Sequence, residues 1–435
     1  MKRELITSLI HWKGKEDRKP LILRGARQVG KTWLLKEFGK SYYQNIAYVN
    51  FETAKSLHRI FETGFDTDKL ITALKIETGA NIVPADTLII LDEIQECEAA
   101  LTSLKYFQEN ANHYHIVAAG SLLGVSLHQN RSFPVGKVDF LDLHPLSFQE
   151  FLMALNEDSL LGILHQKQWD LITGFKTRFI DLLKQYYFVG GMPEVVQSFI
   201  LQNDFQIVRE KQLNILAAYE QDFSKHAPNE IVPRIRLVWQ SLPAQLAKEN
   251  KKFVYGSLKK GARAREFELA IEWLVNAGMV HKVNRCNKPG MPLIAYASLS
   301  DFKLFLLDVG LLAAMGNLQI ATILDEKRLF EEFKGTMSEQ YVLQQLKTIN
   351  QLPICYWAAE NATAEVDFLI QYQNQVIPLE VKASENLKAK SLKVYHEKYH
   401  PVISLRSSLS DYREELWLMN LPLYAIITFF GGRPT

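Results

Sequence analysis

The segment that most constrains the fold is GARQVGKT, residues 25–32, which matches the pattern GxxxxGK[ST] in full. Apolar residues 21–23 precede it and predict a short buried strand, and Leu34, Leu35 and Phe38 follow on one face of a predicted helix. A strand, a glycine-rich turn and a helix in this order bring backbone amides and a helix N-terminus to a phosphate group. The sequence therefore predicts an α/β domain with a nucleotide site near its start.

Every position of this loop is a candidate for binding the cofactor, for which we expect ATP with Mg²⁺. Lys31 would reach the β- and γ-phosphates, and the Thr32 hydroxyl would be a Mg²⁺ ligand. The alternative is a glycine-rich turn that matches by chance. The candidate residues are Gly25, Ala26, Arg27, Gln28, Val29, Gly30, Lys31 and Thr32.

A second motif, TLIILDEIQ at residues 87–95, is an apolar run that ends in Asp92-Glu93. An acidic residue at the C-terminal tip of a buried parallel strand lies beside the phosphate loop. We expect Asp92 to hold the Mg²⁺ shell and Glu93 to polarise the attacking water. The predicted catalytic residues of the first site are therefore Lys31, Asp92 and Glu93.

Further strands are predicted at residues 46–52, 115–121 and 137–143, and Ser147 with Glu150 forms a capping-box pattern for the next helix. Ser121, at the tip of its strand, is either a sensor of the γ-phosphate or the N-cap of a helix. The acid pair Asp92-Glu93 and the strand at 46–52, between the two motifs, resemble P-loop ATPases with an additional strand and a catalytic glutamate, the AAA+ proteins among them.

Near the C-terminus, residues 365–382 (EVDFLIQYQNQVIPLEVK) predict two strands joined by a polar turn. Side chains alternate along a strand, so Glu365 and Asp367 share one face and Glu380 and Lys382 share another. If the strands pair, Asp367, Glu380 and Lys382 converge. Two carboxylates that hold Mg²⁺ beside a lysine suit hydrolysis of a phosphodiester. The alternative is an edge strand whose charges face water.

Composition limits the other classes. The chain has 435 residues, enough for about three domains. Its net charge of +2 gives no overall nucleic-acid signature, so any such contact must come from a local patch. Three widely spaced cysteines indicate neither a disulfide framework nor a zinc site and fit the cytoplasm. No apolar run approaches the roughly 20 residues that span a bilayer, so no membrane partner is expected.

The middle of the chain, residues 204–300, predicts helices, one of them at 264–277, and then two strands around the sequence NKPG. Residues 248–265 contain seven basic side chains and one acidic one, which makes this segment the best candidate for contact with DNA phosphates. A solvated loop or a surface for a protein partner remains the alternative. Gly190-Gly191 and Pro193 predict a tight turn before these helices.

In their order, the motifs resemble one family along nearly the whole chain: the predicted bacterial and archaeal AAA+-type ATPases with an uncharacterised C-terminal domain of restriction-endonuclease-like, PD-(D/E)XK fold. The segments that carry the resemblance are RGARQVGKT, LIILDEIQ, AAGSLLG, PVGKVDFLDLHPLSFQEF, YFVGGMPEVV, LFLLDVGLLAAM, GTMSEQYVLQQL, EVDFLI, PLEVKAS and LPLYAI.

The resemblance implies an α/β architecture of three parts. These are an AAA+-type P-loop ATPase domain at 1–200, a helical and winged-helix region at 201–320, and an endonuclease-like domain at 321–435. In endonuclease-like folds a glutamate on the first helix completes the metal site, and Glu339 occupies that place, on the same helical face as Leu343 and Leu346. Its alternative role is a capping box with Thr336.

The implied metal ligands are thus Glu339, Asp367 and Glu380 in the C-terminal part, besides Thr32 and Asp92 in the first. Family members often carry arginine at position 137, where an arginine finger would contact the γ-phosphate of a neighbouring subunit. This chain has Lys137 there, and lysine replaces a planar guanidinium poorly. Arg131 is a second candidate, and for both residues the alternative is a solvated charge on a loop. AAA+ proteins often form rings, which makes a homo-oligomer one expectation.

The sequence therefore predicts a protein that binds and hydrolyses ATP and couples its nucleotide state to DNA binding or to Mg²⁺-dependent DNA cleavage at Asp367, Glu380 and Lys382. DNA would contact residues 248–265 and the C-terminal domain. The alternative is a nucleotide-operated switch or scaffold that binds a protein partner and whose nuclease-like domain is inactive.

Overall fold

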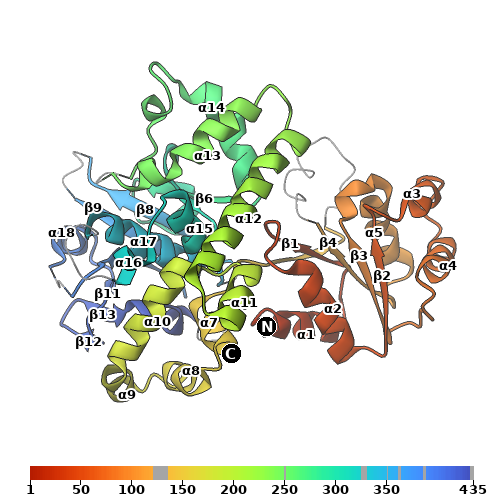
Figure 1. The fold of residues 1–435 in the computed structure, drawn as a ribbon, viewed down its shortest axis with the longest axis horizontal. Helices are drawn as coiled ribbons and strands as arrows, with labels where there is room; N and C mark the ends of the chain where they lie inside the picture. Colours follow the sequence, from red (N-terminus) through yellow and green to blue (C-terminus); the bar gives the residue numbers. More distant parts are fainter. Residues whose placement is uncertain are drawn as a thin grey trace. The chain divides into compact units, whose positions relative to one another are not determined.

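A computed structural model describes residues 1–120, 136–248, 251–324, 331–349, 351–360, 364–385 and 388–431. These residues pack as two compact units. The N-terminal unit comprises Lys2–His144 with Asn276–Gly278, and the C-terminal unit comprises Pro145–Val275 and Met279–Thr435 together with Met1. Figure 1 shows the elements of each unit in the colours of the sequence. Among the described residues, no helix combines the length and apolarity that crossing a membrane requires.

The N-terminal unit is built on a five-stranded parallel sheet with the order β2-β3-β4-β1-β5 (Figure 1). Its strands are β1 (Leu21–Arg24), β2 (Asn45–Asn50), β3 (Thr87–Asp92), β4 (His115–Ala119) and β5 (Asp139–Asp142). Its helices are α1 (Ile6–Gly14), α2 (Lys31–Tyr42), α3 (Lys55–Glu62), α4 (Thr67–Thr78) and α5 (Glu98–Asn110), with a short 3₁₀ helix η1 (Ile94–Glu96).

The apolar runs predicted as strands are the core of this unit. Every residue of β3 and β4 is buried, as expected for central parallel strands covered on both faces. Strand β4 lies between β1 and β3 in the sheet, although it follows both of them in the sequence. Because all five strands are parallel, the segments that follow β1 and β3 lie at the same edge of the sheet.

The C-terminal unit combines helices with a second, larger sheet. Its helices are α7 (Phe148–Ala154), α8 (Asp158–His165), α9 (Trp169–Gly174), α10 (Lys176–Val189), α11 (Pro193–Gln202), α12 (Phe205–His226), α13 (Val232–Leu246), α14 (Ala264–Asn276), α15 (Val309–Met315), α16 (Ile320–Leu324), α17 (Glu331–Lys347), α18 (Lys390–Tyr399) and α19 (Ile426–Phe430), with 3₁₀ helices η2 (Tyr255–Ser257), η3 (Leu293–Tyr296) and η5 (Leu423–Ala425). The capping box of Ser147 and Glu150 is confirmed at the start of α7.

The larger sheet has eight strands in the order β12-β13-β11-β10-β9-β8-β6-β7. They are β6 (Val280–Cys286), β7 (Ala297–Leu306), β8 (Ile354–Ala358), β9 (Glu365–Tyr372), β10 (Gln375–Val381), β11 (Leu405–Ser408), β12 (Arg413–Glu414) and β13 (Met419–Pro422). The two strands predicted around NKPG are β6 and β7. They do not stand apart, because β6 pairs in parallel with β8 and so continues the sheet of the C-terminal strands.

Helix α17 connects many parts of the C-terminal unit through buried polar side chains. Gln340 bonds both the N–H and the C=O of Leu306, Gln344 accepts from the N–H of Val309, and Gln345 accepts from the N–H of Phe148. The capping box predicted for Thr336 and Glu339 is wrong. The helix already begins at Glu331, and the Thr336 hydroxyl instead donates to the C=O of Leu246 at 2.8 Å.

The turn predicted at Gly190-Gly191 lies between α10 and α11. A Cβ on Gly191 would come within 2.2 Å of the Leu146 carbonyl oxygen, so a side chain does not fit there. The Gly191 N–H donates to the carboxylate of Asp308 at 2.6 Å, and this carboxylate also accepts from the side chain of Gln344. The two glycines therefore allow the turn to approach Asp308 closely.

Candidate functional site

The first candidate site is the loop between β1 and α2, whose shape depends on three unusual backbone conformations. Gly25, Gln28 and Gly30 have φ of 148°, 66° and 93°, in the region that L side chains rarely adopt. A Cβ on Gly25 would lie 2.3 Å from the carbonyl oxygen of Leu143. The glycines of the motif thus permit a loop that curls back on itself and exposes its amides.

Lys31, the first residue of α2, folds its side chain back over this loop. Its ammonium group donates to the carbonyl oxygens of Gly25 at 2.9 Å and Ala26 at 2.7 Å. Burial lowers the pKa of Lys31 to about 8, while the nearby charges of Glu93 and Asp92 act in the opposite direction. The buried ammonium is thus held at the loop, within electrostatic reach of both acids.

Asp92, the last residue of β3, brings the second motif to the first. Its Oδ2 accepts a hydrogen bond from the Thr32 hydroxyl at 2.7 Å and another from the Tyr48 hydroxyl at 3.0 Å. Glu93 follows with φ of 48°, and its side chain accepts from Gln95 at 2.5 Å. Lys31, Thr32, Asp92 and Glu93 therefore form one group, as the sequence predicted.

Two further residues of this group were not found from the sequence. Tyr48 lies on β2, two positions before Asn50, which pairs with Asp92, and only this register brings it to the carboxylate. Arg3 is buried and donates to the carbonyl oxygens of Val29 and His144, so a residue near the chain start holds the loop in place. Strand alternation from Asn50 could have indicated Tyr48, whereas no local pattern indicates Arg3.

The predictions on the remaining residues of this region have different outcomes. Lys137 forms an ion pair with Glu109 at 2.9 Å within the same unit, which matches the alternative of an ordinary surface charge. Ser121 and Arg131 lie outside the described residues, so their predicted roles stay predictions.

The residues present fit ATP with Mg²⁺. The loop offers amides, the buried ammonium of Lys31 offers a positive charge, and Thr32 with Asp92 offers two adjacent oxygen donors.

The second candidate site is a cluster of buried charges in the C-terminal unit, which we call the carboxylate pocket. In the register of β9 and β10, Leu379 lies opposite Phe368, so the next positions, Glu380 and Asp367, lie opposite each other. Lys382 Nζ contacts Glu380 Oε1 at 2.7 Å, and Asp367 Oδ2 accepts from the N–H of Val381 at 2.7 Å.

Glu339 reaches this pocket from α17, where it is buried together with Leu343 and Leu346. Its charge acts on Asp367, and the charge of Lys382 acts on Glu339. The structure therefore brings Glu339, Asp367, Glu380 and Lys382 to one place.

Two lysines of the pocket were not predicted as part of it. Lys251 forms an ion pair with Glu339, and Lys303, which is completely buried, forms one with Glu365. Lys303 lies on β7 and Lys251 precedes η2, both far in sequence from the strands that carry the acids. The pairing of β6 with β8 brings Lys303 to Glu365, whereas Lys251 reaches Glu339 from outside the sheet, so neither contact follows from a local pattern.

The electrostatics of the pocket reflect this mixture of charges. Burial and the charge of Glu339 raise the pKa of Asp367 to about 8. Burial disfavours ionised Glu339 as well, but Lys251, Lys303 and Lys382 outweigh that effect and hold its pKa below the usual value. For Lys303, burial is outweighed by Glu365, Glu339 and Asp367, and its pKa lies above the usual value.

As a site for Mg²⁺, the pocket fits poorly. Among the described residues, no three His, Cys, Asp or Glu side chains converge closely enough to hold a metal ion. Glu339 Oε2 and Glu380 Oε2 are buried and have no hydrogen-bond partner in the described part of the chain, yet the other oxygen of each carboxylate already contacts a lysine. Two such oxygens do not make a complete ligand set.

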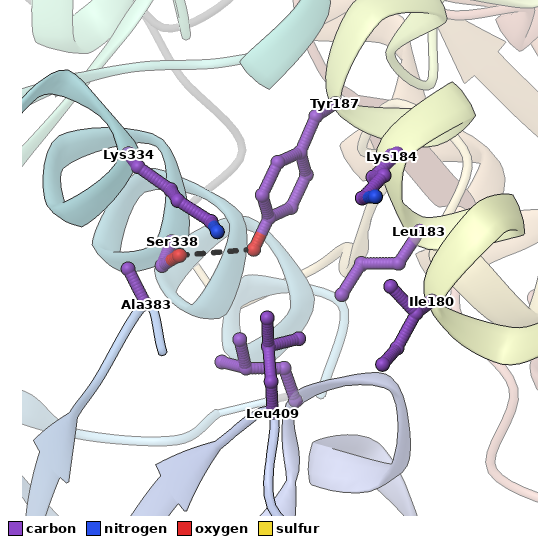
Figure 2. Close-up of a pocket in the computed structure, with 9 residues that line it drawn as sticks. Ile180, Leu183, Lys184, Tyr187, Lys334, Ser338, Ala383 and Leu409 are labelled. Atoms are coloured by element: carbon purple, nitrogen blue, oxygen red, sulfur yellow. Dashed lines mark hydrogen bonds between the residues drawn. The ribbon is translucent and has the colours of Figure 1, made fainter. Parts of the chain in front are cut away.

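A small pocket lies next to this cluster, between α10, α17 and the segments after β10 and β11 (Figure 2). Figure 2 shows Tyr187 pointing toward Ser338, and the Tyr187 hydroxyl donates to Ser338 Oγ at 3.1 Å. Leucine, isoleucine and alanine side chains line much of the rest, with Lys184 and Lys334 at the sides. Its lining includes no carboxylate, so it adds no metal ligand.

Three family models match parts of the chain. An AAA domain matches residues 17–152, and two domains of unknown function, DUF8612 and DUF4143, match residues 180–322 and 334–424. The first match, together with the loop geometry, identifies the N-terminal part as a P-loop domain of the AAA ATPase type. The match at 334–424 carries no assigned function, so a restriction-endonuclease-like fold there stays a prediction.

Among known proteins, an uncharacterized protein of Haemophilus influenzae is 26% identical over 185 residues, which are 41% of this chain and only 40% of that protein. The Walker-type ATPase PABY2304 of Pyrococcus abyssi matches 72% of this chain and 95% of its own, with 12% identity and a TM-score of 0.45. The Orc1 protein of Aeropyrum pernix, solved in complex with DNA, matches 73% and 91%, with 14% identity and a TM-score of 0.26.

Proposed function

We propose that this protein hydrolyses ATP at the site formed by Lys31, Thr32, Asp92 and Glu93. The observation that carries the proposal is the direct hydrogen bond between Thr32 and Asp92, because it joins the two motifs at the place where a nucleotide-bound Mg²⁺ would be held. Bound Mg²⁺ would supply charge neutralisation at the β- and γ-phosphates.

Each side chain has a separate task in this proposal. The loop amides and the Lys31 ammonium bind the triphosphate, and release of Lys31 from the carbonyls of Gly25 and Ala26 frees its donors for the phosphates. Thr32 and Asp92 would hold the Mg²⁺ ion. Glu93, at the tip of β3, accepts the proton of the attacking water.

The test is the steady-state rate of phosphate release by the full chain and two variants. We expect Lys31→Ala to abolish turnover by weakening nucleotide binding. We expect Glu93→Gln to retain binding but to lower the rate about 10²- to 10⁴-fold, the range of a general base. Glu96→Gln is the matched control, because Glu96 is an exposed carboxylate in the 3₁₀ helix η1, which begins directly after Glu93. Unchanged turnover in Lys31→Ala would refute the proposal.

Coupling of the nucleotide state to DNA is the finer part of the proposal. In the basic segment 248–265, Lys251, Lys252 and Lys259 each form an ion pair within the chain. Lys260, Arg263 and Arg265 are exposed and are the best placed to meet DNA phosphates.

The same phosphate-release assay with added duplex DNA, at two salt concentrations, tests this coupling. We expect DNA to stimulate turnover, less so at high salt, and the triple alanine variant of Lys260, Arg263 and Arg265 to lose the stimulation. Alanine at the exposed Lys40, Lys69 and Lys75 is the matched control. A rate of phosphate release that DNA leaves unchanged at both salt concentrations, together with tightly retained nucleotide, would favour the nucleotide-operated switch instead.

A further inference from the structure

We propose that Lys251 and Lys303 take the place of the divalent cation in the carboxylate pocket. On this view the pocket is held together by ammonium groups of the chain itself and binds neither Mg²⁺ nor Mn²⁺.

The charges of the pocket are almost balanced without a metal. Four acidic residues meet three lysines, and each lysine contacts a different acid: Lys251 with Glu339, Lys303 with Glu365, and Lys382 with Glu380. Asp367 is the fourth acid, and it accepts from the N–H of Val381. A divalent cation would therefore bring two positive charges into a site that lacks at most one.

Displacing a lysine would also be costly. The Lys303 side chain is 0% exposed and paired with Glu365, and the charges of Glu339 and Asp367 also stabilise its ammonium, so a metal ion bound by those two acids would repel a buried positive charge that cannot move into water. Lys251, whose side chain is 11% exposed, is closer to solvent, but its partner Glu339 is buried as well. Removing one partner of a buried pair is strongly destabilising, because it leaves an uncompensated buried charge.

The position of Lys251 in the sequence adds a second consequence. It belongs to the basic segment 248–265, yet its charge is directed into the pocket and is not available to DNA. The same contact connects that segment to helix α17, which carries Glu339. Removing this single ammonium frees Glu339 Oε1 beside the unpartnered Glu339 Oε2 and Glu380 Oε2 and leaves excess negative charge, so it should create a cation site that the natural chain does not have.

The experiment measures Mn²⁺ bound to the nucleotide-free full chain by electron paramagnetic resonance, in wild type, Asp367→Asn, Lys251→Met and Lys251→Met/Glu339→Gln. Any Mn²⁺ at Thr32 and Asp92 is common to all four proteins and cancels in their differences. We expect wild type and Asp367→Asn to bind the same amount. We expect Lys251→Met to gain about one ion and the double variant to lose it again.

Cleavage of the chain by hydroxyl radicals from bound Fe²⁺ and ascorbate locates the ion independently. We expect no cuts near residues 339, 367 or 380 in wild type and cuts there in Lys251→Met. Mn²⁺ that binds wild type and is lost in Asp367→Asn, or cuts at these residues in wild type, would overturn the proposal. If Lys251→Met does not fold, these wild-type comparisons still decide. No outcome depends on ATP turnover, so the result is separate from that of the ATPase assay.

Discussion

Burial sets the charge state of single residues in both units, and His115 shows this most simply. It lies on β4, 6% exposed, with its Nδ1 2.8 Å from the Tyr43 hydroxyl. Burial, and then the nearby positive charges of Arg18 and Lys13, lower its pKa to about 4. An unfolded histidine titrates near 6.5. The folded N-terminal unit therefore holds this ring neutral at a pH where the unfolded chain binds a proton.

The sign of the resulting pH dependence follows directly. Because the folded pKa is the lower one, the N-terminal unit loses stability as the pH falls from about 6.5 toward 4. We expect His115→Gln, which cannot titrate, to remove part of this loss. Hydrogen exchange of the β4 peptide 115–119, compared between the two proteins at the same pH, measures it. Equal protection factors of this peptide at pH 4.5 and at pH 7, which correct for the pH dependence of intrinsic amide exchange, would contradict the assignment.

How well single residues could be predicted depended on how local their partners are. Lys31 and Thr32 were identified because eight consecutive residues match one motif, and Asp92 was identified because it ends an apolar run. Lys251 and Lys303 could not be assigned to the pocket, since their partners Glu339 and Glu365 are 88 and 62 residues away in sequence.

Among the helices and turns, those with strong local signals were predicted and those fixed by distant contacts were not. Helix α14 ends at Asn276, close to Gly278, as expected from the glycine. Helix α17 begins before Thr336, so this residue lies inside the helix and does not cap it. Its hydroxyl instead donates to the C=O of Leu246, at the end of α13. The turn at Gly190-Gly191 was predicted, but its reason, the close approach of Asp308 and Leu146, is tertiary.

This close approach predicts a clear difference between two glycines. We expect Gly191→Ala to lower the free energy of unfolding of the C-terminal unit by about 1–3 kcal/mol or more, because the new Cβ meets a backbone oxygen. The matched control is Gly162→Ala in helix α8, where no atom lies within 4 Å of the added Cβ and alanine should be neutral or slightly stabilising.

Urea denaturation followed by circular dichroism measures both variants. Equal midpoints for Gly191→Ala and Gly162→Ala would show that the turn can relax to accept a side chain.

For the molecule as a whole, the sequence predicted the first sheet far better than the second. Each parallel strand of the N-terminal unit is a short apolar run with its own turn signals, although the order of the strands in the sheet was not predicted. The eight-stranded sheet depends on the parallel pairing of β6 with β8, where Arg285 lies opposite Tyr356. No local pattern specifies which of several strands such an edge will join. A winged-helix region at 201–320 and a separate domain at 321–435 therefore stay predictions.

The shared sheet predicts that residues 201–320 do not fold alone. This fragment would lose the pairing of β6 with β8, and it would leave Lys303 buried without Glu365. We expect it to aggregate or to show no cooperative unfolding, whereas residues 145–435, which retain the sheet, fold. Circular dichroism and the dispersion of amide NMR signals distinguish the two. A folded 201–320 fragment would contradict the prediction.

Three glutamines of helix α17 each form a hydrogen bond to a backbone group of another segment, and this has a consequence for how the chain tolerates substitution. Gln340, Gln344 and Gln345 recognise the main chain at residues 306, 309 and 148, whose own side chains do not take part in these bonds. Those neighbours can therefore be exchanged for other apolar residues while the hydrogen bonds persist. The glutamines themselves cannot be replaced without losing these hydrogen bonds. A mutational scan should therefore find that α17 tolerates far fewer substitutions than the segments that it contacts.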